Sequence, residues 1–290
     1  MRNRKTAVAV SIAVAAALAA PALASADDGE MRDMDHGGHK SLTAIGLTSD
    51  QRLVEFTVDR PGKTMSIGKV TGLMDDTRLV GIDFRVQNEK LYGVGDKGGI
   101  YTLDTHNAKA MKVSQLTIAL SGMQFGVDFN PAANRLRVIS NTGQNLRHNI
   151  DDAAAPLVTT TDGMLTNPTT PPSTAMGVTG AAYTNNDLNA ATATSLFDVD
   201  TTNDRVSLQS PANAGTLAPT GNLGVNAGPD AGFDIYYSAK HGTNQGFAAL
   251  NTDGAFRLYD INVLTGAARD LGTFSQRQQV TDLALPLNQS

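Results

Sequence analysis

A four-residue motif recurs along this chain, and the repeat constrains the fold more than any other feature. The motif is a glycine, an apolar residue, an aspartate and an aromatic or aliphatic residue. Its full and partial copies are Gly81-Ile82-Asp83-Phe84, Gly126-Val127-Asp128-Phe129, Gly180-Ala181-Ala182-Tyr183, Gly232-Phe233-Asp234-Ile235 and Thr281-Asp282-Leu283. Their third positions lie 45, 54, 52 and 48 residues apart. A period of this length indicates a repeat architecture.

A second marker runs in phase with the first, an apolar residue followed by Asp or Asn. It occurs once in each unit, at Asp59, Asp104, Asp151, Asp200 and Asn262. Such side chains cap turns, so we expect these five residues to be structural, at the turn into the last strand of each unit. Each unit then consists of four short strands joined by polar turns, which is the pattern of a propeller blade.

The two ends of the chain supply complementary parts of one unit. Residues 42–70 have the pattern of a second, third and fourth strand, and residues 280–287 have the pattern of the missing first strand. Pairing of these segments would close a ring and leave no free sheet edge. We therefore predict an all-β fold, a single five-bladed β-propeller over residues 42–290, closed by pairing of the C-terminal strand with the N-terminal blade.

The first residues have the features of an export signal. Arg2, Arg4 and Lys5 precede an apolar run from Ala7 to Ala20, and the small residues Ala24-Ser25-Ala26 follow it. This pattern predicts a signal peptide over residues 1–26 and a secreted protein, either extracellular or in the periplasm or cell envelope. No later run approaches the ~18 apolar residues that span a bilayer, so no membrane span is expected.

Charge and cysteine content narrow the range of partners. Without residues 1–26, the chain keeps 20 of its 23 Lys and Arg and all 28 Asp and Glu, a net charge of −8. An acidic chain is a poor partner for nucleic acid. The sequence has no cysteine, which excludes disulfides, a thiol nucleophile and a thiolate metal site. We expect a monomer whose partner is an unknown protein or small molecule.

Two long connections indicate where such a partner would bind. Residues 160–180 and 210–232 are rich in Gly, Pro, Thr and Asn and link the fourth and fifth units to their predecessors. Both should crowd one face of the disc, where they either carry binding residues, as long loops on a rigid scaffold often do, or only pack over the mouth of the channel. The polar hairpin of residues 140–149 could also offer donors to an anion, although a hairpin turn is the simpler explanation of its composition.

Several segments resemble a known family. The segments "VGIDFRVQNEKLYGVG", "FGVDFNPAANRLRVISNTGQNLRHNID", "GAAYTNN" with "SLFDVDT", and "AGFDIYYSAKHGTNQGFAALN" are similar to successive parts of the bacterial domain of unknown function 4394 family. The resemblance extends from about Leu42 to Pro286. It implies an exported protein of propeller-like repeat character with no assigned activity, and it transfers no catalytic residue to this chain.

The motif aspartates are the first candidates for chemistry. If the motif strand is the innermost of each blade, Asp83, Asp128, Asp234 and Asp282 form a ring at one height around the axis, interrupted by Ala182. Converging carboxylates must take up protons, find donors or bind a cation, and oxygen ligands suit Ca²⁺ or Mg²⁺. The competing interpretation is that each carboxylate accepts backbone N–H groups of the adjoining blade and only links the blades.

A second candidate metal site lies in the leader predicted over residues 27–41. Met31, Met34, His36 and His39 offer thioether and imidazole groups, which suit copper. A solvated leader without a metal is the simpler interpretation, because chain termini are commonly disordered.

Three functions remain open. The leading one is a non-enzymatic ligand-binding, protein-binding or scaffold protein of the cell envelope or medium. The second is a metal-dependent propeller hydrolase of the lactonase type with Ca²⁺ or Mg²⁺ on the axis, and the third is copper binding by the leader. A serine hydrolase has no support, because no serine lies in a G-x-S-x-G motif.

Overall fold

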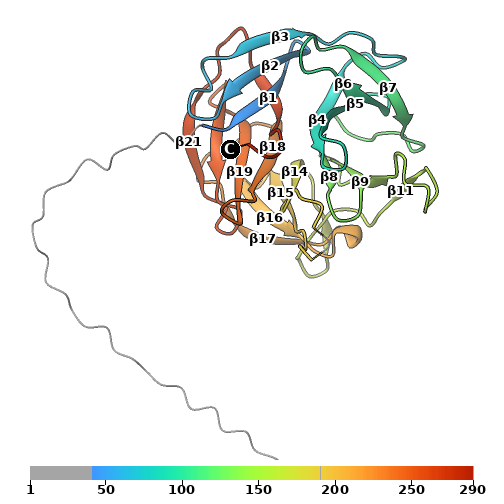
Figure 1. The fold of residues 1–290 in the computed structure, drawn as a ribbon. Coiled ribbons are helices and arrows are strands. Elements are labelled where there is room, and N and C mark those ends of the chain that lie inside the picture. Colours follow the sequence, from blue (N-terminus) through green and yellow to red (C-terminus); the bar gives the residue numbers. More distant parts are fainter. Residues whose placement is uncertain (1–40, 190, 290) are drawn as a thin grey trace, which may run out of the picture. The chain divides into compact units, whose positions relative to one another are not determined.

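The computed structural model describes residues 41–189 and 191–289. Within them, five four-stranded antiparallel sheets form a closed ring (Figure 1). The predicted five-bladed β-propeller is thereby confirmed. No helix among the described residues has the length and apolar character needed to cross a membrane.

The blades follow one another along the chain, and each sheet has its strands in sequence order apart from the closing sheet. The closing sheet contains β22 (Val280–Ala284), β1 (Thr43–Thr48), β2 (Arg52–Thr57) and β3 (Met65–Lys69). The second contains β4 (Leu79–Arg85), β5 (Lys90–Gly95), β6 (Gly99–Leu103) and β7 (Ala110–Gln115). The third contains β8 (Phe125–Asn130), β9 (Arg135–Ser140), β10 (Asn145–His148) and β11 (Thr159–Thr161).

The fourth and fifth sheets complete the ring. The fourth sheet contains β14 (Val178–Tyr183), β15 (Leu196–Asp200), β16 (Arg205–Gln209) and β17 (Leu217–Asn222). The fifth contains β18 (Ala231–Ser238), β19 (Thr243–Thr252), β20 (Ala255–Ile261) and β21 (Ala268–Thr273). A small hairpin of β12 (Thr166–Asn167) and β13 (Ser173–Thr174) lies in the connection between the third and fourth blades, and a short 3-10 helix, Ala212–Ala214, precedes β17.

The first strand of every blade lies against the first strands of both neighbouring blades. The contacts run in the order β22, β4, β8, β14, β18 and back to β22. The motif glycines permit this approach: a Cβ on Gly126 would lie 2.7 Å from the Ala181 nitrogen, and one on Gly232 would lie 2.4 Å from the Asp282 Cα. The glycine of the repeat is therefore a packing requirement of the inner ring.

The two ends of the chain close the ring as predicted. Strand β22 pairs antiparallel with β1, with Ile45 opposite Ala284 and Gly46 opposite Leu283. The pairing register shifts between Leu47 and Thr48. The free edge of the first blade is thus covered by the last strand of the chain.

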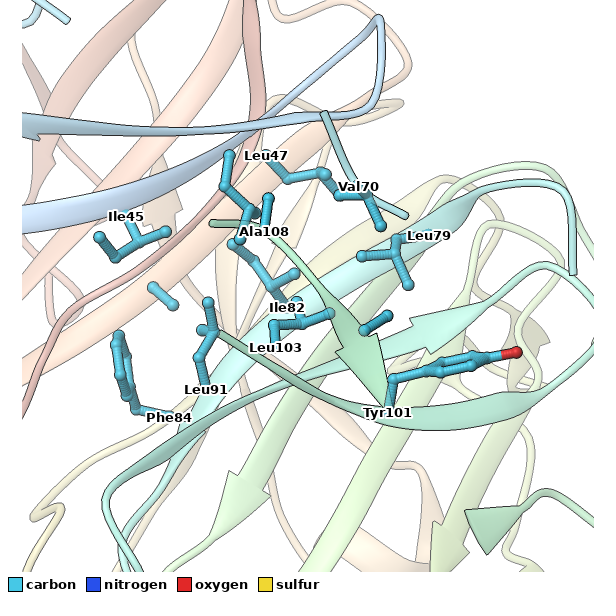
Figure 2. Packing of buried hydrophobic residues seen from close by; sticks show 13 residues of the cluster. Ile45, Leu47, Val70, Leu79, Ile82, Phe84, Leu91, Tyr101, Leu103 and Ala108 are labelled. Carbon is cyan, nitrogen blue, oxygen red and sulfur yellow. The ribbon is translucent and has the colours of Figure 1, made fainter. Parts of the chain in front are cut away.

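The hydrophobic core is divided among the seams between blades. Five apolar clusters are present in the described residues, and each joins two neighbouring sheets. Figure 2 shows the cluster between the closing sheet and the second blade, where Ile45 and Leu47 of β1 pack beside Ile82 and Leu79 of β4. Stability therefore depends on contacts between segments far apart in the sequence.

The fourth blade departs from the predicted strand assignment. Asp200 ends β15, the second strand of its sheet, so its side chain caps the turn into the third strand and not the last one. The predicted long connection over residues 210–232 contains the outer strand β17. Both differences have one origin. The described residues between β14 and β15 form a loop with no strand. The strand that ends at Asp200 is therefore the second of its sheet, whereas the marker spacing predicts that it is the third.

The other Asx residues divide into two groups. Asp104 and Asn262 accept backbone N–H groups within their own turns, as predicted. Asp59 forms an ion pair with Arg60. Asp151 accepts from the guanidinium of Arg85 in the preceding blade and so joins two blades.

Two predictions concern residues outside those described. The signal peptide over residues 1–26 lies there, as does the leader over residues 27–41 except for Ser41. The copper ligands Met31, Met34, His36 and His39 lie there too. Export and copper binding therefore stay predictions.

Candidate functional site

Three of the four axial aspartates follow one hydrogen-bonding rule. Each uses Oδ1 to accept the backbone N–H of the next residue in its own strand, and Oδ2 to accept an N–H of the neighbouring inner strand. Asp83 accepts from Phe84 at 2.7 Å and from Phe129 at 2.8 Å. Asp234 accepts from Ile235 and Leu285, both at 2.6 Å. These carboxylates therefore join adjacent blades.

Asp282 accepts the same two kinds of hydrogen bond, but it lies at a different level along the propeller axis. It accepts from Leu283 at 3.0 Å and from Ile82 at 2.7 Å. Asp83 reaches the residue after Asp128, whereas Asp282 reaches the residue before Asp83. The inner strand β22 is thus displaced by two residues relative to β4.

The contact on the other side of β22 gives the same displacement. Asp234 reaches Leu285, which is three residues after Asp282 and not one. Ala284 therefore occupies the height of the other aspartates. The four carboxylates therefore do not form the predicted ring. Three of them lie together, and Asp282 is displaced from them by two residues along the axis.

The group of three is compact and buried. Asp83, Asp128 and Asp234 each place a carboxylate oxygen within 4.8 Å of the other two. Their exposed fractions are 4%, 1% and 2%. We call these three residues the axial carboxylates.

Asp128 differs from the other two axial carboxylates. Neither of its oxygens has a hydrogen-bond partner among the described residues. The backbone N–H of Tyr183, in the position that Phe129 has for Asp83, lowers the pKa of Asp128 but does not form a hydrogen bond with it. A buried polar group without a partner carries a desolvation cost that a ligand or water could relieve.

The electrostatics of the axis favour neutral carboxyl groups. Burial, followed by the charge of Asp234, raises the pKa of Asp83 well above its usual value. Burial, then Asp83 and Asp234, does the same for Asp128. Burial raises the pKa of Asp234 to about 6. At neutral pH, three negative charges here require protons or a cation.

A cavity lies at the end of the axis where the inner strands begin, which we call the mouth. Its volume is about 130 Å³, and residues at the starts of three inner strands line it, including Leu79, Phe125 and Asp282. Arg78 and Asp230 come from connections that lead into inner strands, and both also line the cavity. Side chains from different blades therefore meet at one small polar site.

The charged groups of the mouth are opposite in sign. Burial raises the pKa of Asp230 to about 6, and the nearby charge of Arg78 opposes that rise. Among the described residues, neither Asp230 nor Arg78 takes part in an ion pair within 4.0 Å. Asp282 is already bonded through both oxygens.

A comparison with protein families places this chain. The model described as "Domain of unknown function (DUF4394)" matches residues 52–284, which is most of the chain. The chain belongs to the DUF4394 family. The resemblance predicted from the sequence is thereby confirmed, and no curated protein matches the chain significantly.

Solved structures similar to this DUF4394 protein are distant. They include an auxiliary nutrient binding protein from Bacteroides ovatus, with a TM-score of 0.42 and 14% identity over 70% of this chain and 55% of that one. A protein from Lactobacillus plantarum gives 0.39 and 18% over 80% of this chain and 67% of its own. Dihydro-heme d1 dehydrogenase NirN gives 0.37 and 11% over 79% and 43%. The chain thus spans about half of the first of these proteins, and such distant likenesses carry no functional argument.

The DUF4394 protein has a further buried charged cluster, in the seam between the third and fourth blades. Arg137 of β9 is 2% exposed and donates to Asp162 and Asn145, both at 2.7 Å, and to Asn213 at 2.8 Å. Arg147 also donates to Asp162, at 2.6 Å. We call these five residues the Arg137 seam.

Sequence reasoning missed the Arg137 seam. The sequence places Arg137 in the strand "RLRVIS", between apolar residues, as an arginine with no evident partner. Asn145 and Arg147 lie in the polar hairpin considered above as an anion site, and here both serve the seam. A charged residue within an apolar strand was the available signal, but its partners come from two blades.

Proposed function

We propose that this DUF4394 protein is a non-enzymatic binding propeller that acts in the cell envelope or medium and takes a small zwitterionic ligand at the mouth. The observation that carries the proposal is the mouth cavity itself, in which Asp230 and Arg78 face one space without an ionic partner among the described residues. The N-terminal sequence features support export.

The size and chemistry of the cavity suggest the ligand class. The cavity volume of about 130 Å³ is several times the ~10–15 Å³ that one water molecule needs by the same measure, so a compound of amino-acid size fits. A guanidinium binds a carboxylate, and a carboxylate binds an ammonium group. One ligand that carries both charges would satisfy Arg78 and Asp230 together.

Position on the scaffold supports the same conclusion. Asp230 ends the connection into the fifth blade, and Met123 and Gln124 end the connection into the third. Binding sites are commonly built from loops held by a rigid scaffold. A protein partner on this face is the alternative ligand, and it would cover the mouth.

Calorimetric titration tests the proposal, with glycine and alanine as zwitterions and with ethylammonium and acetate as single-charge probes. We expect saturable binding of a zwitterion at one site per chain, and weaker binding of both single-charge probes. Asp230→Asn and Arg78→Gln should each reduce the affinity at least tenfold. Asp75→Asn is the matched control, since Asp75 is exposed and pairs only with Lys112.

The proposal fails if no zwitterion gives saturable heat, or if Asp230→Asn binds as tightly as the wild type. The hydrolase predicted as an alternative gains no support from the comparisons, because the matching family is described only as a domain of unknown function. Copper binding by the leader stays a separate proposal, tested by titrating Cu⁺ into the full chain and into a variant without residues 27–39.

A further inference from the structure

The axial carboxylates have an unbalanced charge. Asp83, Asp128 and Asp234 lie within reach of one another. Among the described residues, no Lys or Arg forms an ion pair with any of them. Buried charges in proteins are neutralised, paired or bound to a metal, so this group of three carboxylates must take up protons or a cation.

Asp128 supplies the second, separate observation. Both of its oxygens are buried and without a partner in the described residues, and the side chain lies in the group of three. Backbone amides already fix Asp83 and Asp234 from two sides, which holds their carboxylates in place. An ionised carboxylate has about four acceptor positions, so each of these two also keeps acceptor capacity toward Asp128.

We propose that Asp83, Asp128 and Asp234 bind one divalent cation on the propeller axis, Ca²⁺ in preference to Mg²⁺. The donor set consists of oxygen atoms alone, which suits hard cations. Ca²⁺ accepts irregular geometry at 2.3–2.6 Å, whereas Mg²⁺ demands near-ideal octahedral coordination. Asp282 is outside the site, because the displacement of β22 places it two residues along the axis.

The cation would join three blades. Asp83 belongs to the second blade, Asp128 to the third and Asp234 to the fifth. A cation at this point therefore stabilises the closed ring against separation of its blades, and it does so independently of any ligand at the mouth. The alternative is that the carboxyl groups share protons and no cation binds.

Metal content and thermal unfolding of the full chain decide between these states. The protein is unfolded in guanidinium with EDTA and refolded with EDTA, Ca²⁺ or Mg²⁺, so that slow exchange from a buried site does not hide the effect. We expect about one Ca²⁺ per chain by mass spectrometry of the metal. We also expect a Tm about 5–10 °C higher in Ca²⁺ at 100 times its Kd than in EDTA.

The variant Asp128→Asn should give opposite results for a bound cation and for carboxyl groups that only share protons. With a cation site, the variant loses bound Ca²⁺ and becomes less stable than the wild type in Ca²⁺. With shared protons only, it is at least as stable as the wild type at pH 8 under every metal condition, because it removes a like charge. The matched control is Asp198→Asn, since Asp198 is also buried and has no hydrogen-bond partner among the residues described, but lies near Arg137.

We expect Asp198→Asn to keep one Ca²⁺ per chain and the full calcium response. The proposal is overturned if the refolded wild type carries no Ca²⁺ or Mg²⁺ and its Tm is the same in EDTA and in Ca²⁺. It is also overturned if Asp128→Asn binds Ca²⁺ as the wild type does.

Discussion

The Arg137 seam and the axial carboxylates meet in one hairpin, where Asp128 of β8 stands opposite Arg137 of β9. Arg137 and Asn145 of the seam are buried, as are all three axial carboxylates. In the seam, each charge has a partner of opposite sign or a hydrogen-bonding amide. On the axis, the charges share one sign and Asp128 has no partner in the described chain. Burial alone therefore does not distinguish an architectural charge from a binding one; charge balance and hydrogen-bond satisfaction do.

The largest expected effect comes from unbalancing the seam. Arg137→Met keeps much of the side-chain volume but removes the donor of two amide oxygens and leaves Asp162 paired with Arg147 alone. Breaking a buried ion pair from one side costs about 3–5 kcal/mol, so the free energy of unfolding should fall by that amount in a denaturant titration. Arg135→Met, which affects the more exposed pair with Asp152, should cost less than about 1 kcal/mol. If Arg137→Met and Arg135→Met lowered the free energy of unfolding equally, burial of an ion pair would not explain its contribution to stability.

The stability contributed by the axial carboxylates should depend on pH. The pKa of Asp234 is about 6 in the folded protein, above its ordinary value of 3.8, so the folded state binds the proton more tightly. In EDTA, the stability from this proton is present below about pH 4 and is lost as the pH rises to about 6. The loss is on the order of 3 kcal/mol for Asp234.

Denaturant titrations of the wild type and Asp128→Asn at pH 4, 6 and 8 measure this dependence. In EDTA the wild type should lose stability relative to the variant as the pH rises, because the variant lacks one of the repelling charges. Calcium should reduce that loss in the wild type alone. A wild type that gains stability relative to Asp128→Asn between pH 4 and 8 in EDTA would contradict the assignment.

The mouth should show a smaller effect that concerns binding more than stability. Asp230 has a pKa of about 6, so its carboxylate forms as the pH rises through that value. Affinity for glycine should therefore increase severalfold between pH 5 and 7.5, while both glycine charges are present throughout. Calorimetry at the two pH values measures this change. The dependence should disappear in Asp230→Asn, and its persistence there would exclude Asp230 as its source.

The smallest expected effect is at an exposed turn, where neither burial nor charge contributes. Asn262 accepts the N–H groups of Leu264 and Thr265 at 3.1 and 3.2 Å. Asn262→Ala should lower the free energy of unfolding by about 0.5–1 kcal/mol, as is typical of one hydrogen bond. If Asn262→Ala lowered the free energy of unfolding as much as Arg137→Met does, buried charge would not explain the size of the effect at Arg137.

The outcome in the fourth blade shows where repeat reasoning loses accuracy. The motif spacing located β14 correctly, because Gly180 and Tyr183 match the repeat. The Asx marker then misplaced the later strands, because Asp200 caps a different turn in that blade. Local turn chemistry is the same at either position, so a single side chain could not report its place in the sheet.

The sequence by itself determined the number of blades, the closure of the ring and the strands that carry the motif aspartates. Those features follow from a period and from complementary ends, both of which are written along the chain. Only the tertiary structure decided that Asp282 stands two residues away from the other three, that Asp128 has no donor within the described part of the chain, and that Arg137 finds partners in two blades. The first two depend on contacts between inner strands about 50 residues or more apart, whose register is set by packing around the closed ring and not by any local pattern. The third depends on the contact of Arg137 with Asn213, 76 residues along the chain.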